Sequence, residues 1–216
     1  SIAGTVTDAG SGAPIISMGV IVFDSTGVLV KNTSTDASGN YTVAGLPAGN
    51  YYVRTNPNAV TQNYVAQLYS AFPVISLPTT GTPVDVAVGL AHGGINFALV
   101  PGGTMTGTVT GGGAPLPGVQ IVAYSTAGRL VKISNTDAAG GFTMTGLEAG
   151  NYYVSTHVGF PTPFYQDELF DNQPCLGCLG QTGAGFPIVT LPCTSCAPGV
   201  TTGNQVTIAN GATRTG

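Results

Sequence analysis

The chain has 216 residues, and only 6% of them are charged: five Lys and Arg against nine Asp and Glu. Five basic residues cannot neutralise a run of phosphates or hold the chain on an anionic membrane surface, which argues against nucleic-acid and electrostatic membrane binding. Scarce Glu, Lys and Arg exclude coiled coils, and no apolar stretch approaches the roughly 18 residues of a spanning helix. The 33 Gly and 15 Pro residues, among many Thr and Val residues, predict an all-β fold.

Each half of the chain contains short β-prone segments separated by Gly and Pro turns. In the first half the expected strands are residues 2–7, 20–23, 28–33, 41–44, 51–55, 84–88 and 95–100. In the second half they are residues 105–110, 120–124, 129–134, 142–145, 152–156 and 206–209. Large residues within 64–69 and 165–170 suggest one short helical turn in each half. About seven short strands per half predict two tandem antiparallel β-sandwiches.

The two halves are copies of one unit. GLPAGNYYV at 45–53 recurs as GLEAGNYYV at 146–154, and GTVT at 4–7 recurs at 107–110. The motif at 45–53 recurs 101 residues later. Late in the unit this spacing grows to 122 residues, because GTPV at 81–84 matches GNQV at 203–206. The second copy therefore carries an insertion at about 171–202. We predict two domains, residues 1–103 and residues 104–216.

Both copies contain a Thr-Asp-x-x-Gly turn. In the first copy it includes Asp36 and Gly39, and in the second Asp137 and Gly140. An Asp side chain accepts hydrogen bonds from the backbone just after it, and Gly adopts a positive φ without steric cost. We therefore interpret these acids as turn residues.

The last strand of the first copy has no counterpart in the second. Gly94 aligns with Gly216, so nothing in the second copy matches residues 95–100. A strand without its neighbour is a template for pairing with another chain. We expect an assembly edge formed by Val206, Thr207, Ile208 and Ala209 together with Ile2, Ala3, Gly4 and Thr5. Continuation of the polypeptide beyond Gly216 is the preferred source of the strand, ahead of a contact with the next copy and of an open, solvated edge.

Three motifs resemble a known family: GTVTD at 4–8, TDASGNY at 35–41 and GLPAGNY at 45–51. They are similar to the carboxypeptidase regulatory-like and collagen-adhesin B-type repeat domains of the prealbumin-like sandwich fold. The resemblance implies a non-catalytic extracellular module, often in tandem as a stalk or fibre. Some relatives carry an isopeptide bond from a Lys in the first strand. Lys31 and Lys132 lie on a middle strand instead, so this bond is not expected here.

The sequence offers little catalytic chemistry. A Ser-His-Asp triad needs a histidine, but His92 and His157 do not align between the copies. No nucleophile-elbow, phosphate-binding or zincin motif is present. We therefore expect no enzyme and no cofactor.

The densest acid cluster is Asp167, Glu168 and Asp171, which lack acidic counterparts in the first copy. Such oxygen ligands can hold Ca²⁺, but three acids on one short turn more often form a solvated face. We expect no metal there.

Four cysteines lie in the insertion: Cys175, Cys178, Cys193 and Cys196. Their spacing is close to that of a four-thiolate zinc site. An extracellular location favours disulfides instead, and two bridges would stabilise the insertion by about 2–4 kcal/mol each. Disulfides are the preferred interpretation, with zinc or free thiols as alternatives. Nested pairing is slightly favoured over pairing within each Cys-x-x-Cys.

Aromatic residues could form a sugar-stacking platform: Tyr51, Tyr52, Tyr64, Tyr69, Tyr152, Tyr153, Tyr165 and Phe170. The chain has no Trp, and adjacent tyrosines on a strand normally put one ring in the core. We therefore expect a structural repeat module of an extracellular fibre, filament, stalk or adhesin shaft, at or beyond the cell surface. The expected partners are copies of itself or flanking repeats, with a glycan or host-matrix ligand as a further candidate. The alternative function is a carbohydrate-binding accessory module.

Overall fold

The computed structural model describes residues 1–58, 62–70, 72–73, 78–157, 168–170, 173–174 and 204–215; for 72–73 and 173–174 it describes the backbone alone. Two compact units are present. One contains Ser1–Gly103 with Thr145–Glu148, and the other Thr104–Met144 with Ala149–Gly216. In the described parts of the chain, no helix is long and apolar enough to cross a membrane. Each unit is considered separately below.

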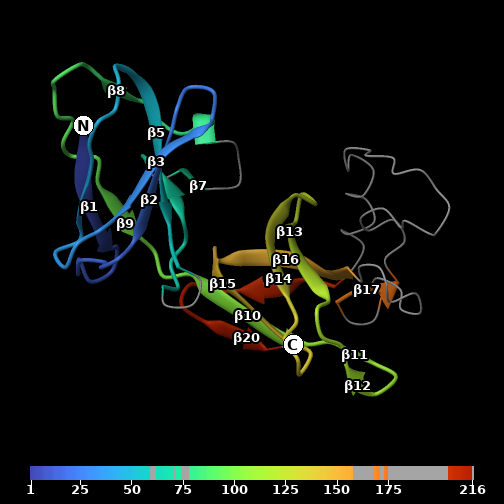
Figure 1. Cartoon of the computed structure of the whole chain (residues 1–216). Coiled ribbons are helices and arrows are strands. Elements are labelled where there is room, and N and C mark those ends of the chain that lie inside the picture. Colours follow the sequence, from blue (N-terminus) through green and yellow to red (C-terminus); the bar gives the residue numbers. More distant parts are fainter. Residues whose placement is uncertain are drawn as a thin grey trace, which may run out of the picture. The chain divides into compact units, whose positions relative to one another are not determined.

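The first unit is a sandwich of two sheets (Figure 1). One sheet has the order β4 (Asn40–Val43), β1 (Ile2–Asp8), β9 (Phe97–Leu99). The other has the order β3 (Leu29–Ser34), β2 (Gly19–Phe23), β5 (Gly49–Asn56), β6 (Gln67–Leu68), β7 (Phe72–Pro73), and β8 (Val84–Val86) also pairs with β5. A 3-10 turn, η1 (Pro78–Thr80), precedes β8.

The core of this unit lies between its two sheets. Alternate residues of a strand point to the same face, and the inward residues are the apolar ones. Ile2 and Val6 come from β1, and Phe97 and Leu99 from β9. They join residues such as Val22 of the opposite sheet in one cluster of buried side chains. Burial of these alternating positions explains why the short strands form here.

The second unit repeats this topology except for the strand that lies beside β10. One sheet has the order β15 (Gly141–Leu147), β10 (Gly103–Thr108), β20 (Thr213–Thr215). The other has the order β14 (Leu130–Asn135), β13 (Gln120–Ser125), β16 (Gly150–His157), β17 (Glu168–Leu169), β18 (Gln173–Pro174), with β19 (Val206–Ile208) also paired to β16. A small hairpin, β11 (Thr110–Gly111) and β12 (Ala114–Pro115), follows β10.

The predicted all-β fold with two tandem sandwiches is confirmed, and each strand expected in the described regions is present. The sheets are antiparallel except for β1–β9 and β10–β20, which are parallel pairs. The Cys-rich insertion lies outside the described residues.

The expected helical turn at 64–69 is wrong. Leu68 pairs with Arg54 of β5, so the backbone there is extended. The second copy behaves alike, because Leu169 pairs with Ser155. Pairing satisfies the backbone groups along the edge of β5 and β16, which an isolated helical turn would leave without partners. Residues 165–167 lie outside the described range.

The Thr-Asp-x-x-Gly turns form as predicted. Oδ1 of Asp36 accepts hydrogen bonds from the backbone N–H groups of Ser38 and Asn40, each at 2.8 Å. These donors hold the pKa of the Asp36 carboxyl below its ordinary value. Gly39 has a φ of 75°, and a Cβ there would lie 2.7 Å from the carbonyl oxygen of Val6. Both the conformation and the space therefore require glycine.

Candidate functional site: an open strand position beside β10

The two units have the same strand register, so their positions can be matched residue by residue. In the first unit Ile2 forms a parallel bridge with His92. In the second, Met105 pairs in parallel with Arg214 in the β10–β20 ladder. Met105 lies 103 residues after Ile2, and Arg214 lies 122 residues after His92, which are the spacings of the repeat at these two places. The two pairs therefore correspond. Thus β20 is the counterpart of the segment around His92, and not of β9.

In the first unit, β9 completes the sheet beside β1. Phe97, Ala98 and Leu99 pair in parallel with Val6, Thr7 and Asp8. The side chains of Ile95, Phe97 and Leu99 alternate into the core and are at most 7% exposed. The strand therefore closes one side of the sandwich with three buried apolar side chains.

Hydrogen bonds also fix the two residues that precede β9, Ile95 and Asn96. The N–H of Ile95 donates to the carbonyl oxygen of Ala3 at 3.1 Å, and its carbonyl accepts from the Tyr41 hydroxyl at 2.6 Å. The backbone N–H of Thr5 donates to Oδ1 of Asn96 at 2.9 Å. At Gly4 the backbones approach so closely that a Cβ would overlap the carbonyl oxygen of Ile95. Gly4 therefore permits this contact.

The matching position in the second unit is a groove of about 290 Å³ beside β10. β20 pairs with β10 as far as Thr106. Beyond that residue, no strand among the described residues pairs with this side of β10. The groove is lined by residues of both sheets, among them Met105, Gly107, Val109, Ile121, Phe142 and Phe170. Their counterparts in the first unit are Ile2, Gly4, Val6, Val20, Tyr41 and Tyr69. Hence the groove has the walls of the β9 site.

Three of these apolar wall residues are more exposed than the matching residues in the first unit, whereas Met105 and Ile121 are buried. Val6 is fully buried, but its counterpart Val109 is only half-buried. Tyr41 is 3% exposed, whereas its counterpart Phe142 is half-buried. Phe170 is 37% exposed. Apolar side chains exposed together in a groove mark a binding surface more often than single exposed residues do.

Two aromatic contacts hold Phe97 in the core of the first unit. The ring of Phe97 lies 6.4 Å from that of Tyr41 and 6.2 Å from that of Tyr69, centroid to centroid. Both distances are within the range of favourable aromatic pairs. Phe142 and Phe170 keep aromatic rings at the two matching positions.

The residues predicted to form the assembly edge lie in two different units. Val206, Thr207 and Ile208 form β19, which pairs with Tyr152, Asn151 and Gly150 of β16, and Ala209 follows it.

Ile2, Ala3, Gly4 and Thr5 pair with β4 on one side of β1. Their assembly role stays a prediction. The open position lies along β10. The sequence analysis did not predict this location. One signal was available: Gly4 and Gly107 occupy matching places inside a strand, where glycine often marks a close backbone approach.

The two histidines lie in different units of the chain. His92 lies in the first unit, where its backbone bonds to Ser1 and Ala3, and His157 ends β16 in the second unit. Among the residues that the structure describes, no group of three His, Cys, Asp or Glu side chains could hold a metal ion. Glu168 is exposed, while Asp167, Asp171 and the four cysteines lie outside the described residues.

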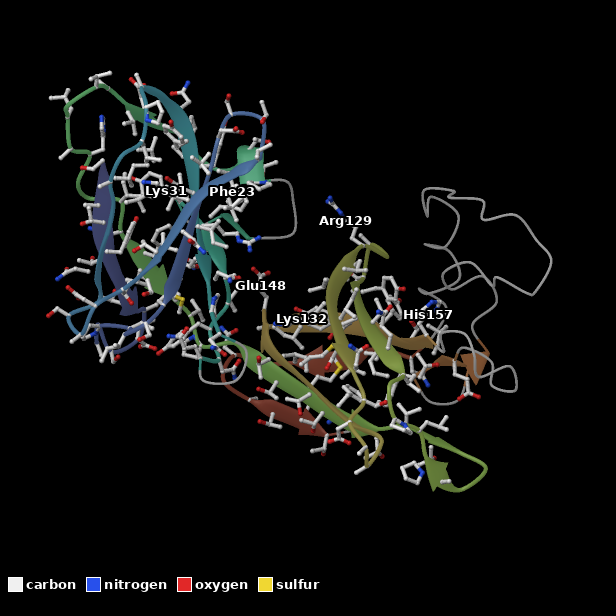
Figure 2. The ribbon with its side chains drawn as sticks, viewed as in Figure 1. Phe23, Lys31, Arg129, Lys132, Glu148 and His157 are labelled. Carbon is white, nitrogen blue, oxygen red and sulfur yellow. The ribbon has the colours of Figure 1, made fainter. Side chains whose placement is uncertain are left out.

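The lysines occupy equivalent places on β3 and β14, as Figure 2 shows. Nζ of Lys31 donates to the carbonyl oxygen of Ala44 at 2.6 Å. Burial lowers the pKa of Lys132. Neither lysine lies on the first strand of its unit, in agreement with the sequence analysis.

Of the tyrosines considered as a sugar-stacking platform, three are buried and Tyr52, Tyr64 and Tyr69 are half-buried. Tyr51, Tyr152 and Tyr153 are buried, with at most 8% of each residue exposed. The hydroxyl of Tyr51 donates to the carbonyl oxygen of Pro47 at 3.1 Å, and that of Tyr153 accepts from Nε2 of Gln205 at 2.8 Å. Buried tyrosines with satisfied hydroxyls serve packing. Tyr165 lies outside the described residues.

Comparison with known families gives a match over residues 1–99, to the carboxypeptidase regulatory-like domain. The matched residues make up just under half of the chain. The resemblance seen in the three motifs is thus confirmed for this regulatory-like domain, which contains β1 to β9. No curated protein matches the chain significantly.

Several solved structures are similar to the chain at low identity. The Bacillus anthracis TIE protein is 16% identical with a TM-score of 0.36, over 99% of this chain and 33% of that one. A streptococcal ancillary pilin is 19% identical with a TM-score of 0.36, over 78% of this chain and 57% of that one. The minor pilin GBS52 of Streptococcus agalactiae is 16% identical with a TM-score of 0.32, over 100% and 94%. The chain thus spans a third to just over half of the first two proteins.

Proposed function

We propose that this chain is a non-catalytic structural repeat module of an extracellular fibre, stalk or adhesin shaft, and that it assembles end to end. The observation that carries the proposal is the difference between its two units. They share one topology and register, but the first is closed by β9 and the second has a groove at the same place. A tandem module whose described residues leave part of β10 unpaired is suited to linking with further polypeptide, because strand addition supplies both backbone hydrogen bonds and apolar burial.

The charge pattern supports an assembling module. A net charge of −4 on 216 residues gives little mutual repulsion between copies. The turns are fixed by aspartate side chains: Oδ1 of Asp8, Asp24 and Asp36 each accepts backbone N–H groups of its own turn. A weakly charged repeat suits a spacer better than it suits a protein that must attract a charged substrate.

Immunogold electron microscopy of the cells that produce the protein tests this function. Antibodies raised against the chain are expected to label surface filaments at regular spacing. Labelling inside the cell, or on a dispersed secreted protein, would contradict the proposal. A glycan array provides the opposing test: low-micromolar binding to one glycan class would favour the carbohydrate-binding alternative.

The proposed location also determines the chemistry expected of Cys175, Cys178, Cys193 and Cys196. Outside the cell these thiols are expected to pair as two disulfides, since oxidising compartments favour cross-links. Intact-mass measurement after alkylation should find four masked thiols that reductant releases. Release of the thiols by a chelator without reductant would establish zinc instead.

A further inference from the structure

We propose that the groove beside β10 binds an extended polypeptide strand with the residue pattern of Ile95–Val100, and that this strand runs parallel to β10. The partner is thus defined by its chemistry: apolar residues at its first, third and fifth positions, Asn at the second and an aromatic ring at the third. The inference names the partner of the assembly site and so rests on the proposed function.

In the first unit, backbone groups of β1 hold the segment that starts at Ile95. The backbone of β10 has the same groups at the matching positions. The carbonyl oxygen of Ala3 accepts from Ile95, and its counterpart is that of Thr106. The N–H of Thr5 donates to Oδ1 of Asn96, and its counterpart is that of Thr108. Thr106 and Thr108 both line the groove. An Asn at the second position of the partner therefore meets a backbone donor on β10.

Gly107 leaves room for the partner's backbone. In the first unit the matching Gly4 admits the carbonyl group of Ile95, which any Cβ would displace. The second unit keeps glycine at this position, within a strand, although glycine weakens a strand relative to alanine. Close approach of another backbone explains its presence in β10.

The inner walls select the side chains of the partner. Phe142 and Phe170 lie where Tyr41 and Tyr69 contact Phe97, so an aromatic ring at the third position should pack between them. The first and fifth positions match Ile95 and Leu99, which are 7% and 0% exposed in the first unit. The fourth position matches Ala98, which faces solvent. The pattern therefore reads apolar, Asn, aromatic, unrestricted, apolar.

Other occupants fit these features less well. A lipid chain or small apolar molecule could cover Phe142 and Phe170, but it would offer nothing to the N–H of Thr108 or the carbonyl oxygen of Thr106. A second folded copy does not present the required segment, because its own Ile95, Phe97 and Leu99 are buried in its first unit. An extended strand satisfies both the polar and the apolar parts of the groove.

Binding of a synthetic peptide tests the proposal. The peptide has the sequence of residues 93–100, Gly-Gly-Ile-Asn-Phe-Ala-Leu-Val, with a dye at its N-terminus, and is titrated into the full chain while fluorescence anisotropy is recorded. We expect saturable binding with one peptide per chain. Amide chemical shifts in NMR spectra should change at residues 105–110, 142 and 170 and leave the first unit unaffected.

Peptide variants separate strand recognition from general hydrophobic binding. Replacing the aromatic residue of the peptide by alanine should weaken binding at least tenfold, which corresponds to about 1.4 kcal/mol. Replacing its Asn by alanine should weaken binding by a smaller factor. Equal binding of a scrambled peptide of the same composition would overturn the proposal, since the groove would then recognise only apolar surface.

Chain variants complete the test. Gly107→Ala places a methyl group where the partner's backbone must pass, so peptide binding should fall at least tenfold. Thr143→Ala is the matched control: Thr143 is exposed and adjacent to Phe142 on β15, and binding should be unchanged. Circular dichroism checks that each variant is folded, and the peptide variants still decide the matter if Gly107→Ala does not fold.

Three results would refute the proposal. One is absence of binding at millimolar peptide, and another is full affinity in Gly107→Ala. The third is concentration-dependent dimerisation of the chain that Gly107→Ala abolishes and the peptide does not inhibit, which would make a second copy the occupant. If the peptide binds as expected but immunogold labelling finds no surface filament, the strand site stands and the proposed function fails.

Discussion

Thr35 and Thr136 are buried polar residues at matching positions of the two units. Oγ1 of Thr35 accepts the N–H of Met18 at 2.8 Å and donates to the carbonyl oxygen of Ile15 at 2.6 Å. Thr136 makes the same two contacts, with Val119 and Leu116. Both threonines are at most 5% exposed. Each hydroxyl therefore connects two backbone groups of neighbouring segments.

Thr35→Val tests the importance of this hydroxyl. The valine keeps the shape but leaves the N–H of Met18 and the carbonyl of Ile15 without their partner. We expect the unfolding free energy of the first unit to fall by about 1–3 kcal/mol. Urea denaturation followed by circular dichroism measures the change. Thr35→Ser retains the hydroxyl and is the control; equal loss in the two variants would show that the methyl group matters instead.

Asp36 determines part of the acid stability. Hydrogen bonds from the backbone N–H groups of Asn40 and then Ser38 lower the pKa of its carboxyl below 3.8, the ordinary value for aspartate. Because the folded-state pKa is lower than the unfolded one, the stabilisation is complete well above 3.8. It is lost as the pH falls through the folded-state pKa.

Asp36→Asn keeps an acceptor oxygen but does not titrate, so its stability should fall less steeply with acid below pH 3.8 than that of the wild type. Denaturant midpoints at neutral and acidic pH measure the slope. Asp8→Asn is expected to act in the same direction, since the N–H of Ser11 and then its hydroxyl lower the pKa of Asp8. An unchanged slope in both variants would show that other carboxylates govern acid unfolding.

The parallel contact between β1 and β9 is the critical element of the first unit. Gly4→Ala introduces a methyl group that overlaps the carbonyl oxygen of Ile95. The two strands must separate, and we expect a loss of about 3 kcal/mol, at the upper end of usual overpacking costs. Thermal unfolding of the variant measures it. The matched change Gly107→Ala should cost less, because its strand faces the groove; an equal loss would contradict the assignment of an open position beside β10.

The open position also has a consequence for the whole molecule. A unit that exposes part of its core should unfold before a closed one, and multidomain chains commonly unfold in more than one step. We expect calorimetry to resolve two transitions, with the second unit unfolding at the lower temperature. The strand peptide should raise only that lower transition, since it binds the folded second unit.

One variant in each unit assigns the two transitions. Gly4→Ala should lower only the upper one. Val122→Ala removes buried methyl groups from β13, where Val122 is fully buried, and should cost about 2 kcal/mol. A domain of this size then unfolds roughly 8 °C or more earlier. A single transition that both variants lower equally would show that the chain unfolds as one cooperative body.

The sequence by itself determined the features that depend on neighbouring residues and on the repeat. Alternating apolar residues predicted the strands, and the Asp and Gly residues of the turns predicted the connections between them. Alignment of the two copies showed that residues 95–100 have no counterpart. These features follow from side-chain periodicity and backbone preference, which act over a few residues.

Only the tertiary structure decided where the missing strand belongs. β9 pairs with β1 across about 90 residues of sequence, in parallel, so no local signal identifies its neighbour. The groove therefore lies along β10 and not beside β19, the strand favoured by its position in the sequence. The sequence also did not predict the extended backbone at Leu68, because pairing with Arg54 of β5 outweighed the local helical pattern. Contacts between distant strands depend on which faces pack together, and that is settled only when the whole sandwich forms.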